Sequence, residues 1–184
     1  FGRSLAVGDV NGDGYDDIVI GGSNITIVLG ASRSTLTNTR LTSNNLDTTA
    51  LNGTSGLMIS YGLSGNPGAV ATGDIFGLGK KDVVFSGGST SNRYWVVYAK
   101  SDWATPLNAG AAFVTDGPPR LWTIGTGVAS FSSLYGFYIF VGTDTANCPF
   151  TSGGIHSLAL ADITAPSAAT WIDGRADIII GDPS

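Results

Sequence analysis

Three copies of one sequence pattern occur in the chain, and this repetition constrains the fold more than any other feature. The copies lie at residues 5–22, 69–88 and 157–184. Each has an alternating apolar segment, an Asp, a polar turn with Gly, a second Asp, and a run of β-branched residues. Self-similarity at a long fixed spacing is typical of repeat architectures, in which one supersecondary unit stacks against the next.

The spacing of the copies predicts the type of repeat. The leading Asp residues are Asp9, Asp74 and Asp162, so the copies are 65 residues apart (9 to 74) and 88 residues apart (74 to 162). Four-stranded antiparallel repeats of this size are blades of a β-propeller. An irregular β-sandwich with accidental similarity is the alternative. We expect one domain at residues 1–184, a partial propeller with approximate blades at 1–60, 61–127 and 128–184 and an insertion near 128–154.

Local patterning independently predicts an all-β chain. The apolar residues occur in short runs bounded by Gly, Asn, Asp, Pro and Ser, which is the signature of strands. No window has a sustained apolar stripe at helical spacing, so we expect no helix beyond a turn or two. The runs are 4–10, 17–20, 25–29, 57–61, 69–75, 83–86, 94–99, 112–115, 121–124, 135–141, 157–163 and 177–180.

Charge and hydropathy exclude several classes of function. The net charge is −5 and only 12% of residues are charged, so the chain has no basic stripe for nucleic acid. The most hydrophobic stretch, 137–141, is bounded by glycines, and no apolar run reaches the roughly 18 residues of a membrane span. The lone Cys148 cannot form an internal disulfide. A surface rich in Ser, Thr, Asn and Gly suits a secreted, extracellular protein.

The first copy resembles a known repeat family. Phe1 and Gly2 are followed by the segment SLAVGDVNGDGYDDIVIGG, which resembles the FG-GAP repeat of integrin α-subunit propellers and their secreted relatives. The dipeptides at 61–62 and 135–136 are both Tyr-Gly and stand near the place of a Phe-Gly. The resemblance implies a β-propeller, a calcium loop in a hairpin, and a non-catalytic extracellular module for cell adhesion or structural assembly.

The residues of the first hairpin loop themselves predict a calcium site. Calcium takes about six to eight oxygen ligands, which alternate residues of a tightly curled loop can supply. Oxygen donors stand at loop positions one, three, five and nine, and Gly14 at position six permits the turn. The expected ligands are the side chains of Asp9, Asn11, Asp13 and Asp17 and the backbone carbonyl of Tyr15.

The same loop sequence has two other interpretations. An EF-hand needs a Glu at position twelve, where this chain has Ile20, and it needs flanking helices where the pattern predicts strands. An Asx-rich turn without metal is the remaining alternative. It would leave three neighbouring carboxylates without a cation, although such groups repel one another.

The other two copies differ at the ligand positions. The second keeps Asp74 and Asp82 but has Phe76 and Leu78 at positions three and five, so we expect no calcium there. In the third copy a lengthened loop could form a weak, distorted metal site, and a metal-free turn is the alternative. Its candidate ligands are Asp162, Asp173 and Asp177.

The remaining candidate chemistry is modification and binding rather than catalysis. Asn24 and Asn52 stand in N-glycosylation sequons, which would make the protein a glycoprotein. His156 is the only histidine and no nucleophile elbow accompanies it, so we expect no enzyme. The aromatic residues Trp95, Trp103, Trp122 and Trp171 could stack on sugars, or could pack between blades.

These observations lead to three hypotheses about function. The first is an extracellular calcium-binding module whose loops contact another protein or a copy of itself. The second is a carbohydrate-binding, lectin-like propeller, and the third a non-catalytic propeller domain of a secreted enzyme such as a phospholipase D-like protein. Closed propellers need roughly four to eight blades, so we expect a longer chain or neighbouring subunits to complete this one.

Overall fold

The protein is an all-β structure, as the sequence predicts. The computed structural model describes residues 2–36, 41–42, 45–46, 51–60, 69–86, 93–103, 121–123, 136–140, 157–162 and 175–181. Within this part the only helix is α1 (Arg33–Thr35), a single turn that begins after Ser32. No helix in these residues has the length and apolar character needed to cross a membrane.

Two larger sheets make up most of the described residues. The first sheet has the order β1-β2-β3-β6-β10, antiparallel except for β10, which pairs parallel to β6. The second has the order β11-β9-β8-β7 and is antiparallel throughout. Their strands are β1 (Ser4–Gly8), β2 (Asp17–Gly21), β3 (Ile25–Val28), β6 (Gly56–Ser60), β10 (Leu121–Thr123), β7 (Val70–Gly73), β8 (Asp82–Ser86), β9 (Arg93–Val97) and β11 (Gly136–Phe140).

Two hairpins complete the described strands. The third sequence copy forms β12 (Ser157–Ala161) and β13 (Asp177–Gly181), and a short pair is formed by β4 (Leu41–Thr42) and β5 (Asn45–Leu46). Each predicted run within the described residues contains a strand, whereas the run at 112–115 lies outside them. The second sheet takes its fourth strand, β11, from within the range 128–184.

All three sequence copies form the same hairpin in the same register. The residue before the leading Asp pairs with the second Asp in each copy. The pairs are Gly8 with Asp17, Gly73 with Asp82, and Ala161 with Asp177. This register repeats because the alternation of apolar residues assigns each strand face, and a shift by one residue would exchange the two faces.

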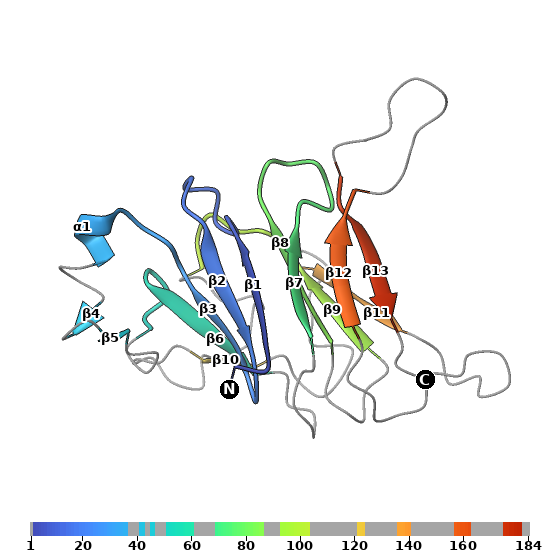
Figure 1. Ribbon diagram of the computed structural model, residues 1–184, viewed down its shortest axis with the longest axis horizontal. Helices are drawn as coiled ribbons and strands as arrows, with labels where there is room; N and C mark the ends of the chain where they lie inside the picture. The colour runs from blue at the N-terminus through green and yellow to red at the C-terminus, as the bar shows by residue number, and fades with distance from the viewer. Residues whose placement is uncertain are drawn as a thin grey trace, which may run out of the picture.

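The first strands of the three copies lie next to one another. Figure 1 shows β1, β7 and β12 as neighbours, with the remaining strands of the first two sheets extending away from them. Contacts join β1 to β7 and β7 to β12. This arrangement is that of consecutive propeller blades, and the described residues form an open series of them rather than a closed ring.

Backbone hydrogen bonds at equivalent positions connect neighbouring copies. The Lys81 N–H donates to the Asp9 carbonyl at 2.8 Å, and the Ala176 N–H donates to the Asp74 carbonyl at 2.7 Å. In both cases the donor precedes the second Asp of one copy, and the acceptor is the leading Asp of the copy before it. Successive repeats therefore stack in the same way.

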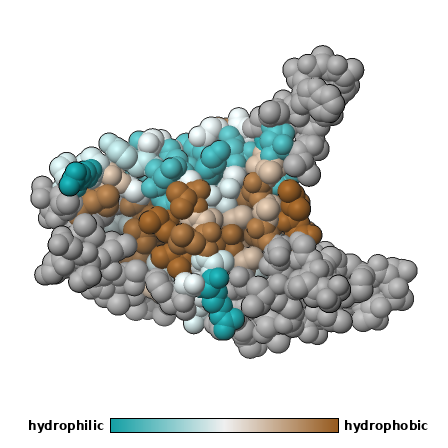
Figure 2. All heavy atoms as spheres, in the orientation of Figure 1, coloured by the Kyte–Doolittle hydropathy of each residue, from teal (hydrophilic) through white to brown (hydrophobic). Residues whose placement is uncertain are grey.

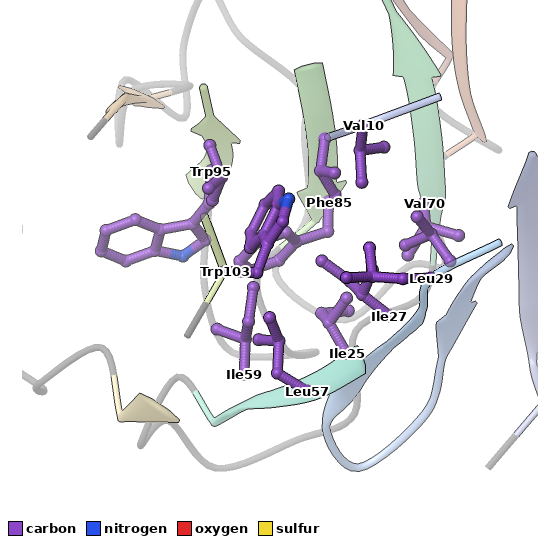
Figure 3. Close-up of a cluster of buried hydrophobic side chains, with 13 residues drawn as sticks. Val10, Ile25, Ile27, Leu29, Leu57, Ile59, Val70, Phe85, Trp95 and Trp103 are labelled. Carbon is purple, nitrogen blue, oxygen red and sulfur yellow. The ribbon is translucent and has the colours of Figure 1, made fainter. Parts of the chain in front are cut away.

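The hydrophobic core lies between the first two sheets. The first sheet contributes residues of β2, β3 and β6, and the second contributes residues of β7, β8 and β9. Figure 3 shows Phe85 and Trp103 facing the aliphatic side chains of the first sheet. The members are Val10, Val19, Ile25, Ile27, Leu29, Leu57, Ile59, Val70, Val83, Phe85, Trp95, Val97 and Trp103. Because both sheets supply this core, neither repeat buries its apolar face alone.

Candidate metal centre

The first hairpin loop is organised around the carboxylate of Asp9. Its Oδ1 accepts hydrogen bonds from the N–H groups of Gly12 at 2.6 Å and Asp13 at 3.1 Å, and its Oδ2 accepts one from Gly14 at 2.9 Å. Gly12 and Gly14 have φ angles of 77° and 87°, in the left-handed region that favours glycine. The loop therefore curls around one side chain.

The side chains of Asn11 and Asp13 extend this network on the exposed part of the loop. Asn11 Oδ1 accepts from the Asp13 N–H and Asn11 Nδ2 donates to Asp13 Oδ2, both at 2.9 Å. Asp13 Oδ1 accepts from the Tyr15 N–H at 2.9 Å. The oxygens of Asn11 and Asp13 are thus near one another and close to solvent.

Asp17 occupies a different environment, because its side chain is fully buried. Its Oδ2 accepts from the Val10 N–H at 2.7 Å and its Oδ1 from the Gly30 N–H at 2.6 Å. Burial raises the pKa of Asp17, the two backbone hydrogen bonds oppose this rise, and repulsion from Asp13 and Asp9 adds to it. Asp17 thereby connects the hairpin loop to the segment that follows β3.

The second hairpin loop has the same backbone organisation. Asp74 Oδ1 accepts from the Leu78 N–H at 2.8 Å and Asp74 Oδ2 from the Gly79 N–H at 2.6 Å, as Asp9 does with Asp13 and Gly14. Gly77 and Gly79 have φ angles of 69° and 77°. The loop shape is therefore preserved although positions three and five carry no oxygen donors.

Asp82 repeats the role of Asp17. It is 3% exposed, and its carboxylate accepts from the Ile75 N–H at 3.0 Å and from the Ala99 N–H at 2.9 Å. Burial raises the pKa of Asp82, and the hydrogen bonds from Ala99 and Ile75 oppose the rise. The Asp at loop position nine thus makes the same two backbone contacts in the loop where no metal is expected.

The comparison of the two loops separates the residues that both loops share from those that only the first loop supplies. Positions one and nine serve the backbone in both loops, whereas Asn11 and Asp13 have no structural counterpart in the second loop. Within the described residues no group of three or more His, Cys, Asp or Glu side chains is assembled so that it could hold a metal ion. The calcium site therefore stays a prediction. Its donor set of carboxylate, amide and carbonyl oxygens fits a hard cation.

The other predicted metal residues lie in the third hairpin. Asp162 directly follows β12 and Asp177 begins β13, and both are half-buried. Asp173 lies outside the described residues, so the weak site predicted for this loop also stays a prediction.

The two sequons differ in their surroundings. Asn52 is exposed, and its Oδ1 accepts from the Thr54 hydroxyl at 2.8 Å and from the Thr54 N–H at 3.1 Å. Asn24 is half-buried before β3, and the Thr26 of its sequon is fully buried within that strand. Of the two, the Asn52 sequon is the accessible one in the folded chain.

A cleft at the second loop has no counterpart in the sequence predictions. It has a volume of about 620 Å³ and is lined by Phe76, Leu78, Lys80, Asp82, Tyr98, Ala99 and Lys100. The rings of Phe76 and Tyr98 meet edge to face with centroids 5.0 Å apart. Burial lowers the pKa of Lys100. In the sequence, only the apolar residues Phe76 and Leu78 at loop positions three and five could have indicated this cleft.

Two of the four Trp residues that could have stacked on sugars lie in the hydrophobic core. Trp95 and Trp103 are each 1% exposed and belong to the core, so packing is the role of these two. Trp122 lies in β10, whereas Trp171, Cys148 and His156 lie outside the described residues.

A family model matches the segment that contains β1, the first hairpin loop and β2. Residues 1–24 match the family model of the FG-GAP repeat. This segment is an FG-GAP repeat. Repeats of this family are generally non-catalytic propeller modules that take part in protein–protein interactions and are typically extracellular. No curated protein and no solved structure matches the chain.

Proposed function

We propose that this chain is a calcium-stabilised FG-GAP module of an extracellular protein, with a role in adhesion or assembly through protein–protein contacts. The observation that carries the calcium proposal is the pair of loops with one backbone shape and different side chains. Only the first loop adds Asn11 and Asp13 to the shared residues, where the second has Phe76 and Leu78.

Electrostatics supports a cation at the first loop. Asp9, Asp13 and Asp17 bring three carboxylates to one hairpin, and repulsion from the other two contributes to the raised pKa of Asp17. A bound calcium ion would supply the opposite charge. The oxygens of Asp9, Asn11, Asp13 and Asp17 and the Tyr15 carbonyl would hold it. A carboxylate has about four lone-pair sites, so Asp9 and Asp17 can accept their backbone hydrogen bonds and still contact the ion.

Calcium should raise the thermal stability of the protein. Extracellular calcium modules have Kd values of about 10⁻⁴–10⁻³ M. At ten times the Kd, binding to the folded state adds about 1.4 kcal/mol. For a chain of this size we expect a rise in Tm of about 3–6 °C between chelator and saturating calcium, measured by scanning calorimetry.

Exchanging the two loop sequences gives matched variants. Asn11→Phe with Asp13→Leu should abolish the calcium-dependent rise in Tm and leave the fold intact, because the second loop folds with those residues. Phe76→Asn with Leu78→Asp should create calcium binding in the second loop, detected by titration calorimetry in the first variant's background. An unchanged Tm of the natural chain on chelation contradicts the calcium proposal.

A further inference from the structure

Neighbouring repeats make the same close contact through a small residue. A Cβ atom added at Gly8 would lie 3.0 Å from the Thr72 hydroxyl oxygen, and one added at Gly73 would lie 2.8 Å from the Leu160 Cβ. Thr72 stands two residues before Asp74, the leading Asp of the second repeat, and Leu160 stands two residues before Asp162, the leading Asp of the third. The glycine position of one repeat therefore receives the first strand of the next.

Each hairpin has two faces with defined partners. We call the face that packs on the preceding repeat the leading face, and the opposite face the trailing face. In the second repeat the leading face consists of Val70, Thr72, Val83 and Phe85, and three of these belong to the core shared with the first sheet. Val83 and Phe85 are fully buried and Val70 is 6% exposed.

The equivalent leading face of the first repeat is open. It consists of Leu5, Val7, Ile18 and Ile20, which lie opposite one another in the register of β1 and β2. Leu5 is 64% exposed, Val7 53% and Ile18 39%. In the second repeat the equivalent apolar face is buried against the first repeat. In the first repeat this face is exposed, because no other repeat within the described residues packs against it.

The third repeat has the complementary open surface. On its trailing face Ile179 is 39% exposed, and Ala159 and Ala161 are also exposed. The equivalent residues of the second repeat, Ala71 and Val84, are 8% and 0% exposed. Figure 2 shows a band of apolar residues across the visible face, at the level of β1, β2, β12 and β13.

We propose that the leading face of the first repeat binds the trailing face of the third repeat in a second copy of this chain. The proposal rests on the proposed role in protein–protein contacts and names the surface and the partner. Its support is continuity with the interfaces between repeats, which use the same faces. Such a head-to-tail contact closes into a ring or continues as a filament.

One position limits the strength of this contact. Ala161 stands where the first two repeats have Gly8 and Gly73. A Cβ at those glycines meets atoms of the next repeat at 3.0 Å or less, so the Ala161 methyl group holds the incoming Val7 of the second copy away. Ala161→Gly should therefore tighten the association by about tenfold or more, which is the direction that distinguishes this geometry from nonspecific apolar contact.

Sedimentation velocity from about 1 μM to about 300 μM protein tests the proposal in solution. We expect the mean mass of the natural chain to rise with concentration. Leu5→Asp with Val7→Asp should weaken the association at least about tenfold, whereas Leu78→Asp, at a residue 76% exposed outside both faces, should not. Circular dichroism and Tm report whether each variant is folded.

Disulfide capture tests the same contact without an apolar-to-charged change. Two chains are mixed under oxidising conditions, both with Cys148→Ser, one with Val7→Cys and the other with Ala161→Cys. At the equivalent contact a Cβ atom added at Gly73 would lie 2.8 Å from the Leu160 Cβ, which is closer than the separation of about 3.5–4.5 Å in a disulfide. A small separation of the two chains, in the direction that Ala161 already imposes, brings the pair into that range. We expect covalent dimers of the mixed pair, and none when Leu78→Cys replaces Val7→Cys.

A chain that stays monomeric over the whole range, or a mixed pair that does not cross-link, overturns the proposal. Association that is insensitive to Leu5→Asp with Val7→Asp in a folded variant does so as well. The proposed function fails separately, because the calcium-dependent Tm is measured on the monomer. A monomeric chain that keeps this Tm response excludes only the self-association.

Discussion

The two buried carboxylates, Asp17 and Asp82, show that one residue type has two uses in this repeat. Each accepts two backbone N–H groups, one from the hairpin loop and one from the segment after the third strand. These are strong hydrogen bonds because the acceptor is charged, and they offset part of the cost of burial. In the first loop the same residue is also one of the candidate calcium ligands.

Replacing Asp82 by Asn should destabilise the protein. The amide has one acceptor oxygen and presents its NH₂ group to the other backbone donor, so one charge-assisted bond is lost, at about 1.5–3 kcal/mol in urea unfolding. Asp16→Asn is the matched control, because Asp16 is exposed, and should change the stability by less than about 0.5 kcal/mol.

The pH dependence of this effect follows from the raised pKa of Asp82. The folded state binds the proton more tightly than the unfolded state, whose pKa is near the ordinary value of 3.8. The contribution of Asp82 to stability is therefore largest below that value, decreases as the pH rises to the raised pKa, and is constant above it. The stability difference between the natural chain and Asp82→Asn should decrease with pH in that window, and a difference that increases with pH would contradict the assignment.

At the scale of elements, the hairpins are joined by close backbone approach rather than by large side chains. Gly73 lies at the end of β7, where a Cβ atom would be 2.8 Å from the Cβ atoms of Leu160 and Ala176. Both atoms are attached directly to the backbone, Leu160 within β12 and Ala176 just before β13, so neither can move away easily. The contact between β7 and the third hairpin therefore depends on the missing side chain of Gly73.

Gly73→Ala should reduce the free energy of unfolding by about 1–3 kcal/mol through this overlap. Ala176→Gly in the same chain removes one of the two opposing Cβ atoms and should restore part of the loss. The coupling in the double-mutant cycle, measured by urea unfolding, locates the effect at the contact between repeats. Additive effects of the two substitutions would place the cost elsewhere.

At the scale of the whole molecule, stability is distributed unevenly along the repeats. The core lies between the first two sheets, where every residue of β3 and β8 is buried. The described residues of β12 and β13 are only half-buried or exposed on both faces of the hairpin. Burial of apolar area is the dominant stabilising term, so the third hairpin should open at lower free energy than the shared core.

Hydrogen exchange can measure this gradient. Amides of β3 and β8 should exchange at or near the free energy of global unfolding, and those of β12 and β13 should exchange faster, at sub-global free energies. Equal protection in all four strands would show that the third hairpin unfolds together with the core. The comparison is made below the association range, because the proposed self-association would bury the third hairpin.

Local sequence determined the strands, the three hairpins and the loop shape. Alternating apolar residues define the strand faces, and an Asp followed by Gly at fixed offsets defines a curled loop, so both features depend on neighbours in the sequence. The match of residues 1–24 to the FG-GAP repeat has the same local basis. The oxygen donors Asn11 and Asp13 likewise follow from the local sequence, and their binding of calcium is the prediction that the loop exchange tests.

Tertiary structure alone decided what lies next to these hairpins. The pairing of β10 with β6 and of β11 with β9 joins segments far apart in the chain, and no local pattern specifies which sheet edge a short strand completes. The donor Gly30 that engages Asp17, and the donor Ala99 that engages Asp82, come from the segments after the third strands. Hydrogen-bond partners and open faces are set by packing between distant segments, and for that reason the structural role of Asp17 and the exposure of Leu5 and Val7 emerged only from the fold.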